Sequence, residues 1–447
     1  SRFKFKDPIL AGAILNIAIT MLELSMAGFF SWYISGRLTI EINRFHAAAG
    51  AMGIYSTLPL ILNSRSGVFS LTARPFGSFL VGLSIVTIIT GLEYGGWLWL
   101  SIPLLAGWLL VFTSKFGVQA YFFSTLAISL ITMDIRPFAV FIFSLITALL
   151  LGRNHALKVM KGHLLHMNFY CRFLQYKHIA TVFRTWTFRK WLIFASKSRS
   201  PRKILEAGYK TPIIRLLFFI PWLLMLPAFF ITPAVKDPVI FKLLILPFIG
   251  IMLALLFTWR HLRFLGEADR YQSFFGMFPL AVASGISFSL LDWWLSYWLL
   301  VVITVFISTL FVMENIKRVQ KTNSEERQAL IDWLNNYAVE DSKVIIVPTN
   351  LAGGLLPFTK CTFIGVYSGV LESSMQKQFA SLYPKYYPYP ELDFEKLKRE
   401  WGGDYVIYSR HYCSASYLKS IEMDIEDLNI PDIQPLFEND MFVLYKI

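Results

Sequence analysis

Long apolar runs separated by short polar turns fill the first 314 residues of the chain. A membrane-spanning helix needs roughly 20 mostly apolar residues, and ten runs approach that length. The runs at 47–63 and 274–291 are the weakest. The first has only 17 residues and contains Pro59, and the second contains Gly276, Pro279 and Gly285, so either could be re-entrant or interfacial. The pattern predicts an α-helical polytopic membrane protein of about ten spans, at residues 9–35, 47–63, 76–92, 96–113, 117–133, 136–152, 211–234, 239–258, 274–291 and 295–313.

The pattern changes after residue 314, where short apolar runs alternate with helical periodicity. Residues 324–340 place their apolar side chains on one helix face, and residues 392–400 predict a second helix that Gly402-Gly403 ends. A partly parallel sheet in a small α/β domain is therefore expected. Its predicted strands are residues 343–348, 363–367 and 404–408, followed by a hairpin of 436–438 and 441–445.

Composition agrees with this division. The chain is 55% hydrophobic and only 16% charged, whereas soluble proteins carry about 25% charged residues, so an ordinary soluble enzyme is excluded. Residues 1–314 carry a net charge of +17 and residues 315–447 a net charge of −4. The predicted organisation is a six-span bundle at 1–152, a connection at 153–210, a four-span group at 211–314 and a soluble domain at 315–447.

The connection 153–210 holds 13 basic residues and a single acid, Glu206. Basic loops prefer the cytoplasmic side of a membrane, so this loop is expected inside. Counting spans from it puts the soluble domain inside as well. Basic residues interleaved with aromatic ones favour amphipathic helices lying on anionic lipid headgroups; a plain solvated loop is the alternative, and nucleic-acid binding is not expected. The aromatic residues are Phe169, Tyr170, Phe173, Trp186, Phe188 and Trp191.

No catalytic triad, phosphate loop or metal-binding spacing stands out, and three scattered cysteines form no framework. Glu23 lies inside the first predicted span, with Asn16 and Thr20 on the same helix face. A carboxylate in the membrane is costly and usually has a partner or a task. Glu23 is therefore either a substrate-binding acid or a neutral group in a packing hydrogen bond.

Residues 37–46 form a polar loop between the first two predicted spans. Arg37 and Arg44 could hold a phosphate bidentately, and Glu41 or His46 could take a proton from an acceptor hydroxyl. An interfacial turn with polar anchors is the alternative.

A third polar cluster follows the eighth predicted span. It is expected to be an internal salt-bridge lock or a phosphate-binding site, formed by Arg263, Glu267, Asp269 and Arg270.

The order of parts resembles membrane glycosyltransferases of the GT-C type, which use polyprenyl-phosphate-linked sugars. The resemblance rests on a body of many spans, an acid in the first external loop, here Glu41, and an α/β tail. Stretches 383–392, 403–408 and 437–446 look like the tails of such proteins. The resemblance implies an external cavity in which Glu41 is the base or orients a divalent metal. It also implies an external tail, opposite to the side that the charge count gives.

The leading hypothesis is a glycosyltransferase that uses a lipid-linked sugar in envelope polysaccharide or glycolipid synthesis. Its partners would be membrane lipids and the lipid-linked sugar, and it would be an integral, multi-pass protein of a prokaryotic plasma membrane. The second hypothesis is a carrier of a lipid-linked or anionic solute, with a site near the membrane midplane. The third is a non-catalytic subunit whose tail docks envelope-assembly partners.

Overall fold

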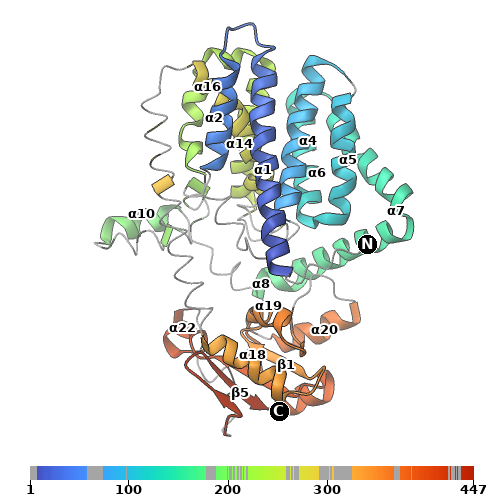
Figure 1. Ribbon diagram of the computed structural model, residues 1–447, viewed down its shortest axis with the longest axis vertical. Coiled ribbons are helices and arrows are strands. Elements are labelled where there is room, and N and C mark those ends of the chain that lie inside the picture. Colours follow the sequence, from blue (N-terminus) through green and yellow to red (C-terminus); the bar gives the residue numbers. More distant parts are fainter. Residues whose placement is uncertain are drawn as a thin grey trace. The chain divides into compact units, whose positions relative to one another are not determined.

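The computed structural model divides the chain into two compact units (Figure 1). The helical unit comprises residues 1–161 and 186–313, and the sheet unit comprises residues 162–185 and 314–447. The structure describes the following residues, with isolated ones between them: 8–57, 74–96, 98–177, 188–198, 220–257, 271–290, 325–366, 373–383, 385–420 and 434–447.

The helical unit consists of long apolar helices joined by short turns. They pack around one large hydrophobic core that includes Phe30, Tyr55, Ile85, Trp222 and Leu243. The described elements are α1 (Pro8–Ser35), α2 (Arg44–Ser56), α4 (Arg74–Tyr94), α5 (Leu98–Thr113), α6 (Lys115–Thr132), α7 (Arg136–Phe169), α10 (Phe188–Lys197), η2 (Pro221–Leu224), α13 (Leu226–Phe229), η3 (Pro233–Lys236), α14 (Pro238–Leu256), η5 (Gln272–Gly276) and α16 (Met277–Leu290).

Four of these helices are long and apolar enough to cross a membrane. They lie in α1, α4, α14 and the stretch that begins with α7, and they match four of the ten predicted spans. Within the described residues, α5 and α16 are apolar but shorter. The expectation of about ten spans is therefore not supported. Of the predicted run at 47–63, residues 47–56 lie in α2 and residues 58–63 lie outside the described residues, as does most of the run at 295–313.

The predicted span 211–234 is wrong as a continuous helix. Its described part is a series of four-residue elements, η2, α13 and η3, with prolines at 221, 227 and 233. Proline lacks the amide hydrogen of a helix and clashes with the preceding turn, so three prolines six residues apart prevent a helix long enough to span. The segment is nevertheless central to the unit, since Trp222, Leu226 and Phe229 are buried.

Small residues let α1, α2 and α16 approach closely. A side chain at Gly285 of α16 would meet the backbone of Ala47 and Ala51 in α2 at 2.5 Å. The Ser31 hydroxyl of α1 donates a hydrogen bond to the same Ala47 carbonyl at 2.9 Å. Close backbone packing replaces the hydrophobic driving force that helices lack in lipid, so this contact fixes the first helices of the chain.

Helix α7 is interrupted at Arg153, whose φ of 42° is left-handed. Before Arg153 the helix is an apolar run that begins at Arg136, and after it the helix carries Lys158 and Lys161. A left-handed residue inside a helix changes the direction of the axis. The kink therefore separates the part of α7 that is apolar enough to span a membrane from a basic part.

The sheet unit contains five strands in the order β2-β1-β3-β5-β4. Strand β1 pairs in parallel with β2 and β3, while β5 runs antiparallel to both β3 and β4, which confirms a small, partly parallel sheet. Its elements are η1 (Tyr170–Leu174), α8 (Gln175–Lys177), α18 (Glu325–Tyr337), β1 (Lys343–Val347), η6 (Thr349–Leu351), α19 (Ala352–Leu355), η7 (Leu356–Phe358), β2 (Thr362–Phe363), α20 (Ser373–Leu382), α21 (Phe394–Lys396), η8 (Leu397–Trp401), β3 (Tyr405–Ser409), α22 (Ala415–Ser420), β4 (Phe437–Glu438) and β5 (Phe442–Lys446).

The sheet unit takes part of its core from the connection between the two transmembrane groups. Phe169 and Phe173 stack on each other at 5.2 Å and pack edge-on against Phe379 of α20. The Lys177 ammonium donates to the Tyr383 carbonyl at 3.0 Å, and the Tyr387 amide donates to the Lys177 carbonyl at 2.9 Å. The expectation that Phe169 and Phe173 lie on the membrane surface is therefore wrong, because both are buried against the sheet unit.

Candidate functional site

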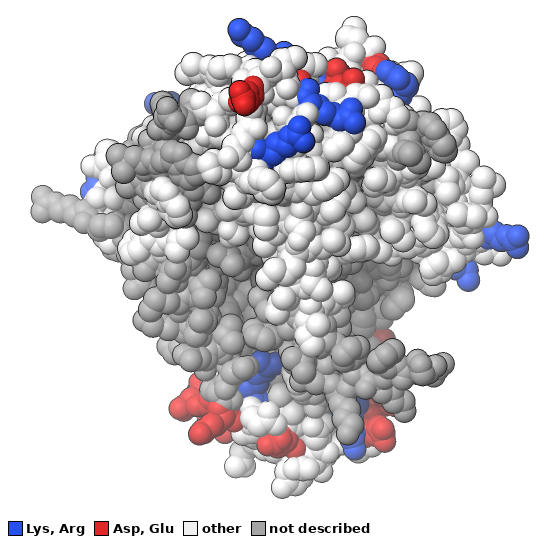
Figure 2. Space-filling model, turned by 45° about the horizontal axis from the view of Figure 1, so that its top comes forward, with Lys and Arg blue, Asp and Glu red and all other residues white. Residues whose placement is uncertain are grey.

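Three turns of the helical unit meet at one end, which we name the turn end. They are the α1–α2 loop, the residues after α4, and the residues before α14. Arg37 of the first turn lies over the ring of Tyr94 at the end of α4, and Glu93 forms an ion pair with Lys242 of α14. The Asp134 turn between α6 and α7 lies close enough for its charge to interact with Lys242. Figure 2 brings this end forward and shows acidic and basic side chains gathered on it.

Arg37 is the centre of an aromatic platform. Its guanidinium carbon lies 4.7 Å from the centroid of the Tyr33 ring and 5.3 Å from that of Tyr94. Trp99 of α5 packs against Tyr33 with ring centroids 5.0 Å apart. Stacking on aromatic rings holds a guanidinium by cation–π attraction while leaving its donors available. The α1 helix ends just before Arg37, so the platform joins the first loop to α4 and α5.

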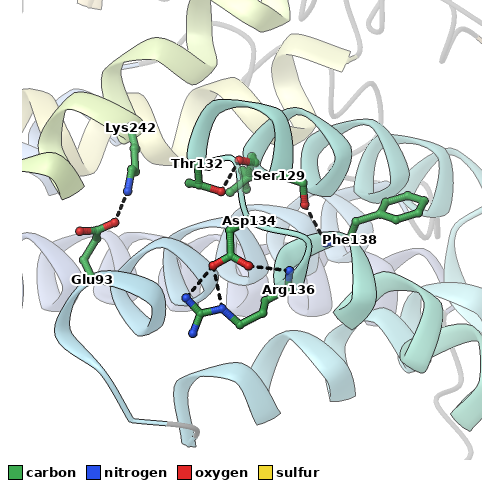
Figure 3. Close-up of polar contacts among 8 residues, drawn as sticks. Glu93, Ser129, Thr132, Asp134, Arg136, Phe138 and Lys242 are labelled. Carbon is green, nitrogen blue, oxygen red and sulfur yellow. Dashed lines mark hydrogen bonds and ion pairs between the residues drawn. The ribbon is translucent and has the colours of Figure 1, made fainter.

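Arg37 has no ion pair among the described residues, and it differs from Arg44 and Lys236 because its guanidinium lies over two tyrosine rings. The neighbouring acids are already neutralised: Glu93 by Lys242, and Asp134 by Arg136 (Figure 3). The buried hydroxyl of Tyr94 likewise has no hydrogen-bond partner in the described part of the chain. The guanidinium of Arg37 is therefore exposed and not engaged by an acid of the described residues.

Asp134 is held in place by local chemistry. Its carboxylate accepts hydrogen bonds from the Arg136 side chain at 2.7 Å and from the Arg136 amide at 2.8 Å. The side-chain bond lowers the pKa of this exposed carboxyl below its usual value. In Figure 3 the Asp134–Arg136 and Glu93–Lys242 pairs lie near each other, and each carboxylate points at its own cation. These two pairs fix the turn rather than offer a free acid.

Asp237 begins α14 as its N-cap. The carboxylate accepts hydrogen bonds from the amides of Val239 and Ile240, at 2.8 and 3.3 Å. Burial raises the pKa of the Asp237 carboxyl, and the charge of Glu93 adds to this effect. Capping satisfies amides that the first turn of a helix leaves without partners, so Asp237 has a structural role that ties it to α14.

The predicted loop residues separate into two groups. Arg44 folds back over the Trp32 ring and donates to the Gly36 carbonyl at 3.3 Å, which the absence of a side chain at Gly36 permits. Glu41 and His46 are exposed. Both predicted phosphate-binding arginines therefore lie over aromatic rings, but Arg44 also donates to the Gly36 carbonyl, whereas Arg37 lies over two tyrosine rings.

Glu23 lies on the packed face of α1 and is 0% exposed. The same face carries Ala27, Phe30 and Ile34, which are also fully buried. The side chain thus points into the helical unit and not toward lipid, as expected of an acid inside a span. It is well separated along α1 from Arg37, so the two belong to different depths of the unit.

The remaining candidates give no site among the described residues. Arg263, Glu267, Asp269 and Arg270 lie outside them. Within the described ranges, no group of three or more His, Cys, Asp or Glu side chains could hold a metal ion.

The carboxyl edge of the parallel strands in the sheet unit is filled by side chains. In open α/β sheets this edge is the usual place for a ligand. Here Thr349, which follows β1, is buried. Its hydroxyl donates a hydrogen bond to the Pro388 carbonyl and accepts one from the Tyr383 hydroxyl. Cys413, after β3, points its sulfur at the Val347 carbonyl at 3.5 Å. Thr349 and Cys413, the described residues at this edge, are therefore part of the core of the sheet unit.

Sequence reasoning missed the aromatic half of the platform. Tyr33 and Trp99 were absorbed into predicted spans, Tyr94 fell in the short turn between the predicted spans 76–92 and 96–113, and Lys242 lay inside an apolar run. One signal was present in the sequence. Successive loops alternate between the two sides of the membrane, and on this count each of these residues lies at the same side as Arg37. Comparison with protein-family models finds no matching family, and comparison with curated proteins finds no matching relative.

Proposed function

We propose that this protein binds a polyprenyl-phosphate-linked sugar at the turn end of its helical unit and transfers the sugar to an acceptor. The observation that carries the proposal is Arg37, exposed on the rings of Tyr33 and Tyr94 and without an ion pair among the described residues. Arginine binds phosphate oxygens through two parallel hydrogen bonds. The tyrosine and tryptophan rings beside it present the flat surfaces on which sugar rings pack.

In this proposal the acceptor hydroxyl attacks the anomeric carbon of the sugar. The bond between that carbon and the phosphate oxygen breaks, and polyprenyl phosphate leaves with the bonding electrons. Glu41, four residues beyond Arg37, takes the proton of the acceptor, and Arg37 stabilises the charge on the leaving phosphate. No metal is needed to balance this step.

The proposal includes a multi-pass arrangement in a prokaryotic plasma membrane. The four long apolar helices would span it. Helices α2, α5, α6 and α16 would lie beside them within the bilayer. The number of membrane segments would then approach the predicted number of about ten. The apolar composition and the ion pairs at one end of the unit support this arrangement.

The test is transfer by the purified full-length protein in lipid nanodiscs, measured as release of polyprenyl phosphate. Arg37→Gln should reduce release by about two powers of ten, because charged transition-state donors contribute on this scale. Lys236→Gln removes another exposed cation at the same end and serves as the control. Equal release by wild type and Arg37→Gln would remove Arg37 from the reaction. Normal release by Glu41→Gln would remove the proposed base.

A carrier function is the second candidate, and two observations favour it. Glu23 is fully buried within α1, and the segment from Pro221 to Lys236 is a discontinuous helix buried in the same unit. Carriers form midplane sites from such broken helices and intramembrane acids. Movement of a lipid-linked sugar across reconstituted vesicles without release of polyprenyl phosphate, lost in Glu23→Gln, would favour this function over transfer.

A further inference from the structure

Helix α10 (Phe188–Lys197) lies outside the packed core of the helical unit. It has no buried residue, and Phe188, Leu192 and Ile193 are 49%, 47% and 47% exposed. Figure 1 shows α10 projecting sideways, across the direction of α1 and α4. A ten-residue helix with large apolar side chains this exposed is unfavourable in water, so its surroundings must supply an apolar phase.

The helix is amphipathic. At 100° per residue, Phe188, Trp191 and Leu192 fall on one face, and the rings of Phe188 and Trp191 stack with centroids 5.9 Å apart. Arg189, Lys190 and Lys197 fall on the opposite side. Residues 153–205 contain no acid at all, so this part of the chain carries a large net positive charge.

Other parts of the basic connection have different environments. Residues 162–177 contribute Phe169 and Phe173 to the sheet unit. The basic part of α7 that follows the kink at Arg153 belongs to the helical unit and carries exposed Lys158 and Lys161 beside Leu157, which is 57% exposed. The connection is thus divided between a structural segment and two exposed basic helices.

We propose that α10 is a membrane-surface anchor that binds the headgroups of anionic lipids, with its Phe188–Leu192 face inserted among the acyl chains. The basic side chains of α10 complement an anionic surface. The exposed apolar face favours a lipid bilayer over a soluble acidic partner, because only the bilayer offers an apolar interior. The chain already contains helices apolar enough to lie in that bilayer. The anchor concerns the basic connection and is independent of sugar transfer at the turn end.

The experiment uses the full-length protein in nanodiscs of phosphatidylcholine, with or without added phosphatidylglycerol. A nitroxide is attached at Leu192→Cys in a Cys171→Ser background, since Cys361 and Cys413 are buried. Collision with oxygen reports lipid, and collision with a water-soluble nickel complex reports water. A label at Val339→Cys, an exposed position of the sheet unit, gives the water reference.

We expect the Leu192 label to favour oxygen strongly when phosphatidylglycerol is present. Reversing three charges together, Arg189→Glu, Lys190→Glu and Lys197→Glu, should lower the ratio of inserted to free helix by at least about a hundredfold, because each basic residue near an anionic surface contributes about fivefold. The matched control reverses Lys360, Lys377 and Lys398 of the sheet unit and should leave the label unchanged.

Two results would overturn the proposal. One is a Leu192 label as accessible to nickel as the Val339 label in both lipids. The other is equal insertion in both lipids that survives charge reversal, since binding would then be independent of headgroup charge. Insertion that requires phosphatidylglycerol and is lost on reversal of the α10 charges supports it.

Discussion

Replacing Phe169 by alanine should destabilise a sheet whose first strand begins more than 170 residues later in the chain. Phe169 ends α7, is 3% exposed, and packs against Phe173 and Phe379. Truncating a buried phenylalanine to alanine costs about 3–5 kcal/mol through lost burial and the cavity left behind. The sheet unit is expected to lose stability on this scale, while the transmembrane helices keep theirs.

Hydrogen exchange measured by mass spectrometry on the full-length protein tests this. Amides of β1 and β3 that exchange through opening of the unit should do so about two to three powers of ten faster in Phe169→Ala, at 1.4 kcal/mol for each tenfold. Leu164→Ala lies on the same helix, and Leu164 is 61% exposed, so the control should change exchange little. Acceleration below tenfold in β1 and β3, or acceleration confined to residues 162–177, would refute the assignment of this segment to the core of the sheet unit.

Three further predictions concern both units. Burial raises the pKa of the Cys413 thiol to about 12, and the thiolate is the reactive form of cysteine. In the native protein near pH 8, iodoacetamide should therefore modify Cys413 about three powers of ten more slowly than an unperturbed thiol. Rapid labelling would contradict its burial. Trp222→Phe removes the 3.1 Å hydrogen bond from the indole to the Thr57 hydroxyl; the loss should cost about 1–3 kcal/mol and lower the thermal midpoint in detergent, whereas Ser56→Ala at an exposed position should not. Gly285→Ala places a methyl group against the backbone of α2; this overpacking should cost at least about 1–3 kcal/mol, and an unchanged midpoint would show that α2 and α16 can separate freely.

The sheet unit could be predicted from sequence largely because its signals are local. Asp393 caps the helix that begins at Phe394, and Gly402 ends it with a left-handed φ of 63°. Alternating apolar runs gave β1, β3 and the final hairpin within one or two residues. Helix α20 was missed because Tyr and Pro residues follow it and obscure its periodicity.

The helical unit was predicted less well because hydropathy does not report backbone geometry. The run 211–234 is apolar throughout, but prolines at 221, 227 and 233 divide it into short elements. Contacts with α16 and the hydrogen bond from Trp222 to Thr57, at the end of α2, hold this irregular backbone inside the helical unit. The run resembles a membrane span because it is apolar, and its apolar residues are buried inside the helical unit.

The candidate site was predicted in part. Arg37 and its loop could be identified because charged residues between apolar runs are conspicuous. Their partners, Tyr94, Trp99 and Lys242, come from segments 57 to 205 residues further along the chain, and no local pattern links them. Nor could sequence separate Arg37 from Arg44, because the difference is the contact of Arg44 with Gly36 and Trp32.

The shared core of residues 162–177 and the sheet has a consequence for biosynthesis. Phe169 leaves the ribosome 277 residues before Lys446, the end of β5, so at typical synthesis rates it waits roughly 14–55 s for the last strand of its own unit. During that time its ring and that of Phe173 have no sheet to pack against, although α7 is already made. The nascent chain must shield this aromatic segment, and a ribosome stalled before β3 would leave it exposed to chaperones and proteases.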